Sequence, residues 1–122
     1  MVNIPTFDNS EDEFNYYDER MNELFPDLKF SPNHEDYNKL NDVLVQAKTA
    51  IVYHDYTCYC WDYENFQSHH KELFIIQRDH NITYNDFYTE CEKLWKHQPC
   101  NHNFLEIIEV DENNVITMWF GS

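Results

Sequence analysis

The cysteine and histidine residues are the part of this sequence that could do the most specific chemistry. Cys58 and Cys60 alternate onto one face of an expected strand, and Cys100 and His102 do the same at the start of another. If these strands are neighbours, the four side chains can converge as the ligands of a structural zinc ion. The spacings differ from the usual C-x2-C knuckle. Reduced, unligated cysteine is therefore the favoured interpretation, and a zinc-stabilised domain is the alternative.

Catalysis by a cysteine nucleophile would pair Cys100 with His97 or His102. A catalytic thiolate usually lies near a helix N-terminus or a cation, whereas Cys100 follows the expected C-terminus of a helix, whose partial negative charge disfavours a thiolate. Paired carboxylates could serve a hydrolase, and Glu106 and Glu109 interrupt an otherwise apolar strand. Both residues can equally mark the solvent-facing side or the edge of that strand. No G-x-S-x-G, H-E-x-x-H or phosphate-binding loop is present. We therefore expect a protein that is not an enzyme, with a small enzyme as a remaining alternative.

The charge of the chain narrows the class of partner. The formal net charge is −15, from 23 acidic and 8 basic residues. Such a chain repels phosphate backbones and anionic lipids, so direct binding to nucleic acid or a membrane is disfavoured. No apolar run is long enough to span a membrane, and the acidic N-terminus lacks the pattern of a secretion signal. A cytoplasmic location is the default expectation.

A protein-binding surface is the function that charge and aromatic content together favour. Residues 53–66 contain more aromatic side chains than one buried strand face can absorb. Tyrosine and tryptophan anchor many protein interfaces, and carboxylates among them suit a partner with a basic surface. The expected contact residues are acidic positions of a first helix and aromatic positions of a first long strand: Asp12, Asp18, Glu19, Glu23, Tyr53, Tyr56, Tyr59 and Trp61.

Other interpretations of the same residues stay open. The carboxylates can form a solubilising surface with no partner, and the aromatic residues can occupy both faces of a covered central strand. A further hypothesis is a mimic of nucleic acid, with carboxylates at phosphate-like spacing, that inhibits a DNA- or RNA-binding protein.

Two helices are expected in the first half of the chain, after a loose segment over residues 1–9. Ser10 and Glu13 have capping-box spacing and predict a helix that ends before Pro26. A second helix is predicted from Pro32 or Asn33 to about residue 49. Its buried stripe would consist of apolar residues at helical spacing: Tyr37, Leu40, Val43, Leu44 and Ala47.

The second half carries the clearer local signals. Residues 50–61 and 73–78 are predicted strands. Thr83 with Asp86, and Ile82 with Phe87, form a capping box and a hydrophobic staple that begin a helix. Residues 104–110 and 115–120 are predicted strands joined by the four turn-forming residues DENN. The order ααββαββ predicts one α+β domain over residues 1–122, with an antiparallel sheet of about four strands and helices on one face.

The motifs ITYNDF (82–87), HNFLE (102–106) and WFGS (119–122) resemble small uncharacterised proteins of large DNA viruses, including those of amoebae. The resemblance covers about the last third of the chain. It implies a viral setting, in the host cytoplasm or the virion, and no catalytic residue. The leading hypothesis is a virus-encoded, non-enzymatic, acidic interaction module. In it, residues 10–25 and 53–66 contact a basic protein, and residues 72–120 support the domain.

Overall fold

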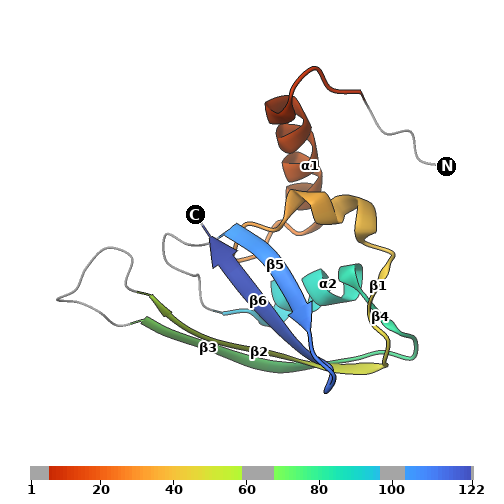
Figure 1. The fold of residues 1–122 in the computed structure, drawn as a ribbon, viewed down its shortest axis with the longest axis vertical. Helices are drawn as coiled ribbons and strands as arrows, with labels where there is room; N and C mark the ends of the chain where they lie inside the picture. Colours follow the sequence, from red (N-terminus) through yellow and green to blue (C-terminus); the bar gives the residue numbers. More distant parts are fainter. Residues whose placement is uncertain (1–5, 59–67, 97–103, 122) are drawn as a thin grey trace.

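The computed structural model describes residues 6–58, 68–96 and 104–121, and gives only the backbone of residues 55–58 and 68–72. The fold is α+β, as predicted, with a sheet covered by helices on one side (Figure 1). The elements in chain order are α1 (Ser10–Leu24), the 3-10 helix η1 (His34–Lys39), β1 (Val43–Val45), β2 (Thr49–Cys58), β3 (Ser68–Gln77), β4 (Ile82–Thr83), α2 (Tyr84–Leu94), β5 (Phe104–Val110) and β6 (Val115–Gly121).

Two antiparallel hairpins, β2–β3 and β5–β6, form the main sheet, whose strand order is β3-β2-β6-β5. They meet where β2 runs parallel to β6, through the pairs Ile51↔Val115 and Val52↔Ile116. In Figure 1 the hairpins cross at this junction and then diverge. The predicted antiparallel pairing is correct within each hairpin and wrong at the junction. The chain between β3 and β5 passes through α2, and such a long connection permits parallel pairing.

The first two helices differ from their predicted forms. The N-cap of α1 is Asn9 rather than Ser10, and its side chain accepts a hydrogen bond from the Asp12 backbone N–H at 2.9 Å. The second helix is wrong, because residues 34–39 form only η1, and residues 43–45 form β1, which pairs with β4. The backbone carbonyls of Leu40 and Asp42 accept hydrogen bonds from the first N–H groups of α2. The two carbonyls are thus used to bind the free N–H groups at the N-terminus of α2 and are not available to a helix of their own. The β-branched residues Val43 and Val45 that follow favour the strand β1.

The predicted start of α2 is confirmed. The Thr83 hydroxyl accepts a hydrogen bond from the Asp86 N–H at 3.1 Å, and the Asp86 carboxylate accepts one from the Thr83 N–H at 2.9 Å. Ile82 and Phe87, the predicted staple pair, are both fully buried. The capping box therefore fixes where α2 begins. The apolar side of α2 packs into the core that it forms with the sheet and α1.

The predicted DENN turn is also confirmed, between β5 and β6. The Asp111 carboxylate accepts hydrogen bonds from the N–H groups of Asn113 at 2.8 Å and Val115 at 3.0 Å. Asn114 adopts a positive φ of 61°, which asparagine tolerates better than most residues. The Asn114 carbonyl accepts a hydrogen bond from the Ile51 N–H at 3.0 Å. The turn thus also ties the second hairpin to β2.

A polar network connects the end of β3 to the first turns of α2. Arg78 donates to Asp86 at 3.0 Å and to Glu90 at 2.9 Å, and the His80 ring lies 2.9 Å from the second Asp86 oxygen. Burial by itself raises the pKa of Asp86, but the hydrogen bonds from Thr83, His80 and Arg78 outweigh it and lower that pKa below its usual value. The ionised carboxylate therefore stabilises the fold.

We predict that Asp86→Asn lowers the free energy of unfolding at neutral pH by about 2–3 kcal/mol, because it weakens the cap and the Arg78 ion pair together. The pKa of Asp86 is lower in the folded than in the unfolded chain. Its contribution is therefore present above the unfolded pKa and is lost as pH falls through the folded pKa. Urea unfolding from neutral pH to about pH 2 measures both effects, and the two proteins should converge in acid.

Asp79→Asn is the matched control. The Asp79 side chain is almost fully exposed and contacts only the His80 ring of this network. Its replacement should change the free energy of unfolding by less than about 0.5 kcal/mol. Equal effects of the two substitutions would refute the role assigned to Asp86.

Candidate protein-binding surface

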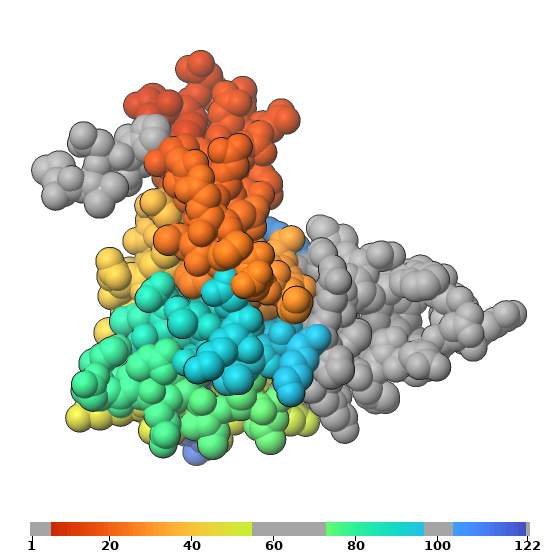
Figure 2. Space-filling view, turned by 180° about the vertical axis from the view of Figure 1, so that it is seen from behind, coloured from red at the N-terminus to blue at the C-terminus, as the bar shows by residue number. Residues whose placement is uncertain are grey.

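Side-chain alternation divides the main sheet into two faces of different character. On the inner face Val52, Ile76, Ile116 and Met118 are buried in the core with the helices. Figure 2, seen from behind, shows α1 and α2 in front and almost nothing of β5 and β6. Large apolar residues also occupy the opposite side of the same strands, the outer sheet face. They are Tyr53 (44% exposed), Leu73 (68%), Ile75 (58%), Ile107 (53%) and Trp119 (53%).

The strand register places these apolar residues beside one another. Tyr53 lies opposite Leu73 in the β2–β3 hairpin, and Ile107 lies opposite Trp119 in the β5–β6 hairpin. Ile75 lies opposite Ile51, which in turn pairs with Val115 across the junction. Single exposed apolar residues are common on protein surfaces, whereas several that are neighbours across strands form a continuous patch, which is typical of interaction sites.

Two carboxylates from β5 lie among these residues. Glu109 is exposed and lies opposite Thr117 of β6. Glu106 is also exposed, at an irregularity in the β5–β6 pairing between Leu105 and Ile107. The prediction that both glutamates mark the solvent-facing side of this strand agrees with their exposure. The outer sheet face is therefore apolar, with acidic side chains along β5.

The predicted acidic contact residues all lie on α1, which projects from the rest of the molecule (Figure 1). Asp12, Glu19 and Glu23 are exposed, and Asp18 is half-buried. Arg20 forms an ion pair with Glu23 at 2.9 Å and lies 3.8 Å from Glu19. The inward side of α1 is apolar and buries Tyr17 and Met21.

Tyr53 is the predicted aromatic contact residue that the structure shows on the outer sheet face. The side chain of Tyr56, and Tyr59 and Trp61 altogether, fall outside what the structure describes. Figure 1 places α1 and β2 at opposite ends of the molecule. The acidic residues of α1 and Tyr53 therefore do not lie on one continuous surface, and no local sequence pattern indicates this separation.

The predicted zinc ligands stay a prediction. Cys58 is the last residue of β2, where the backbone alone is described, and Cys60, Cys100 and His102 lie outside the described residues. Within the part of the chain that is described, no group of three or more histidine, cysteine or acidic residues could hold a metal ion. Cys91 is buried, in agreement with its predicted place on the apolar side of α2. No helix in the same residues is long and apolar enough to cross a membrane.

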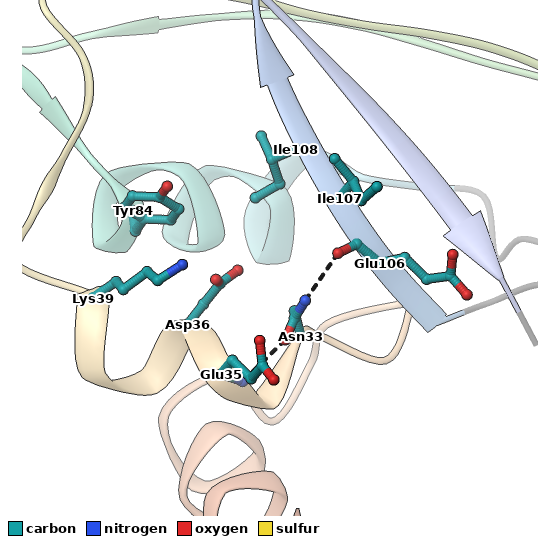
Figure 3. Close-up of a pocket in the computed structure, with 8 residues that line it drawn as sticks. All are labelled: Asn33, Glu35, Asp36, Lys39, Tyr84, Glu106, Ile107 and Ile108. Atoms are coloured by element: carbon teal, nitrogen blue, oxygen red, sulfur yellow. Dashed lines mark hydrogen bonds between the residues drawn. The ribbon is translucent and has the colours of Figure 1, made fainter.

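A polar pocket of about 210 Å³ lies between η1, the start of α2 and β5 (Figure 3). The buried Asp36 carboxylate accepts a hydrogen bond of 2.5 Å from the Tyr88 hydroxyl. Burial raises the pKa of Asp36 more than the Tyr88 hydrogen bond and the Lys39 charge lower it. The Glu106 side chain points away from the pocket, towards β6 (Figure 3). The Asp36 carboxylate in this pocket is therefore already hydrogen-bonded within the protein, and its bond to Tyr88 connects η1 to α2.

We predict that Tyr88→Phe destabilises the protein by about 1–3 kcal/mol at neutral pH, because a buried ionised carboxylate loses its donor. The folded pKa of Asp36 is already raised, so the stability associated with this group falls as pH rises from its unfolded pKa through its folded pKa. Losing the donor raises that pKa further. The destabilisation measured by urea unfolding should therefore be larger at pH 7 than at about pH 4.

Tyr84→Phe is the control, since Tyr84 lines the same pocket with a partly exposed ring. It should change the free energy of unfolding by no more than about 0.5 kcal/mol. A Tyr88→Phe effect that is independent of pH would contradict the assignment to Asp36.

No protein-family model matches the chain, and neither a curated protein nor a solved structure matches it. The chain is an α+β protein with a four-stranded mixed sheet, an outer sheet face that carries exposed apolar residues, and a projecting acidic helix.

Proposed function

We propose that the protein is a non-enzymatic interaction module that binds a basic protein through the outer sheet face. The observation that supports this most is the exposure of Tyr53, Leu73, Ile75, Ile107 and Trp119 on one side of the sheet. Leaving such side chains in water is unfavourable, because burying a leucine or isoleucine fully is worth about 1.5–3 kcal/mol. A partner that covers the face recovers part of this free energy on binding.

The composition of the face fits an interface better than an accidental exposure. Tryptophan and tyrosine supply large contact areas with few rotatable bonds, and they are common where binding energy is concentrated. Trp119 and Tyr53 are accompanied by branched aliphatic residues that can exclude water around them. Buried contacts of this kind govern how slowly a complex dissociates.

The net charge of −15 supports a basic partner. Opposite charge accelerates encounter, whereas nucleic acid and anionic membranes would be repelled. α1 contributes to this field, since its first turn is acidic and its last turn contains no basic residue. We therefore assign long-range attraction to α1 and the lasting contacts to the outer sheet face.

The viral setting implied by the resemblance of the C-terminal motifs suits two forms of this function. The protein would be a component of a virion or of a viral assembly, or it would occupy the cationic surface of a host or viral protein. Both forms require the same outer sheet face, so the same variants test them.

We predict that Leu73→Asn combined with Ile75→Thr reduces partner recovery at least tenfold in affinity purification from infected or expressing cells. Both side chains are more than half exposed, so their replacement removes binding contacts and leaves the core intact. Quantitative mass spectrometry of the recovered proteins is the measurement, and unchanged urea unfolding verifies the fold.

Val43→Thr is the matched control. Val43 is also exposed and apolar, but it belongs to β1 in the separate two-stranded sheet. This variant should recover the partner as the unaltered protein does. Equal recovery by the Leu73/Ile75 variant, or recovered proteins without a basic surface, would refute the proposal.

A further inference from the structure

We propose that the outer sheet face contains a subsite for an arginine side chain of the partner, formed by Trp119 between Glu106 and Glu109. The inference rests on the proposed function, because it specifies the chemistry that the partner presents to this face. It is carried by the strand register and by the close approach of one glutamate to the single glycine of the chain.

The register places Trp119 and Glu109 on the same side of the β5–β6 hairpin. Thr117, Trp119 and Gly121 alternate with Met118 and Phe120 along β6 and therefore share the outer side. Glu109 of β5 lies opposite Thr117, one step along the face from Trp119. Ile107 lies directly opposite Trp119, and Glu109 is therefore a diagonal neighbour of Trp119 on this face.

Glu106 supplies the second carboxylate, on the other side of Trp119. A Cβ atom at Gly121 would lie 1.8 Å from Oε1 of Glu106 and 2.4 Å from its Cδ, so the carboxylate occupies the space above the Gly121 backbone. Gly121 has no positive φ, so its backbone conformation does not require glycine. The absence of a side chain at Gly121 leaves the space that the Glu106 carboxylate occupies, one step along the outer face from Trp119.

Neither arginine of the chain is paired with these two glutamates. Its arginines are bound elsewhere, Arg20 to Glu23 on α1 and Arg78 to Asp86 and Glu90. Neither Glu106 nor Glu109 forms an ion pair with a described residue. Two carboxylates that flank an exposed tryptophan leave a place where a positive charge from another molecule is favoured.

An arginine side chain fits this place better than the alternatives. Its planar guanidinium can stack on the indole ring while its N–H groups donate to carboxylates at the ring edges. A lysine ammonium can make the charge contact but lacks the planar stacking surface. A second copy of this chain is disfavoured, because each copy carries a net charge of −15 and would bring the same two glutamates to the interface.

The test is an NMR titration with N-acetyl-arginine amide, followed through the Trp119 indole N–H and the backbone signals of β5 and β6. The matched probe is the citrulline amide, which has nearly the same shape and no charge. We expect saturable shifts with the arginine probe in the millimolar range and at least about fivefold weaker binding of the citrulline probe. The lysine probe should bind with intermediate strength.

Three variants define the subsite. Glu106→Gln and Glu109→Gln should each weaken the arginine probe about two- to fivefold, as expected for an exposed ion pair. Gly121→Ala should weaken it similarly with both carboxylates retained, because the new methyl group displaces Glu106. Glu112→Gln, in the exposed β5–β6 turn, should leave binding unchanged. The unperturbed signals of the inner face verify that each variant is folded.

Equal binding of the arginine and citrulline probes, or equal effects of Glu112→Gln and Glu109→Gln, would overturn the subsite. Dimerisation through Trp119, measured by sedimentation, would overturn it in favour of a second copy. Loss of partner binding in the Leu73/Ile75 variant with no arginine-specific shifts would refute the subsite and leave the proposed function standing. Arginine-specific shifts, together with unaltered partner recovery by the Leu73/Ile75 variant, would refute the proposed function and leave the arginine subsite standing.

Discussion

The parallel contact between β2 and β6 is the constraint on which the rest of the structure depends. It consists of two register pairs, so the two hairpins are joined at one end and diverge from there. Aromatic rings fill the space between them on the inner side. Trp95, at the C-terminal end of α2, lies 5.4 Å from the Phe30 ring and 5.8 Å from the Phe120 ring. His54 lies 5.3 Å from Phe120 and completes this cluster. The helix that supplies Trp95 must therefore lie on the inner side.

The exposure of the outer sheet face follows from this arrangement. α1, η1 and α2 contribute to the inner core, and Figure 2 shows α1 and α2 together on that side. The outer side of the strands nevertheless remains apolar, which is unfavourable for a protein that acts alone. A strongly negative charge opposes contact between copies of this face and favours contact with a basic protein. Topology and charge thus lead to the same functional proposal.

The sequence predicted those features that neighbouring residues determine. The Thr83–Asp86 capping box and the DENN turn each depend on a few consecutive residues, and the structure confirms both. The helix predicted from about residue 33 to 49 was wrong, because the carbonyls of Leu40 and Asp42 bind the start of α2, far away in the sequence. The outer sheet face was missed for a related reason. Trp119 belongs to the run VITMWF, in which apolar residues point to both faces of the strand, so the run does not reveal which face stays uncovered. The position of Glu106 over Gly121 depends on the pairing of two strands and on an irregularity in it.

Site-specific photo-cross-linking in expressing cells tests the central claim most directly, with the photoreactive residue benzoylphenylalanine placed at one position at a time. Ile75 and Trp119 are suitable positions on the outer sheet face, and Thr89 is an exposed control position on α2. The proposed binding mode predicts cross-links to the same basic protein from the first two positions and none from the third. Cross-links that form only from Thr89 or from positions on α1 would contradict it.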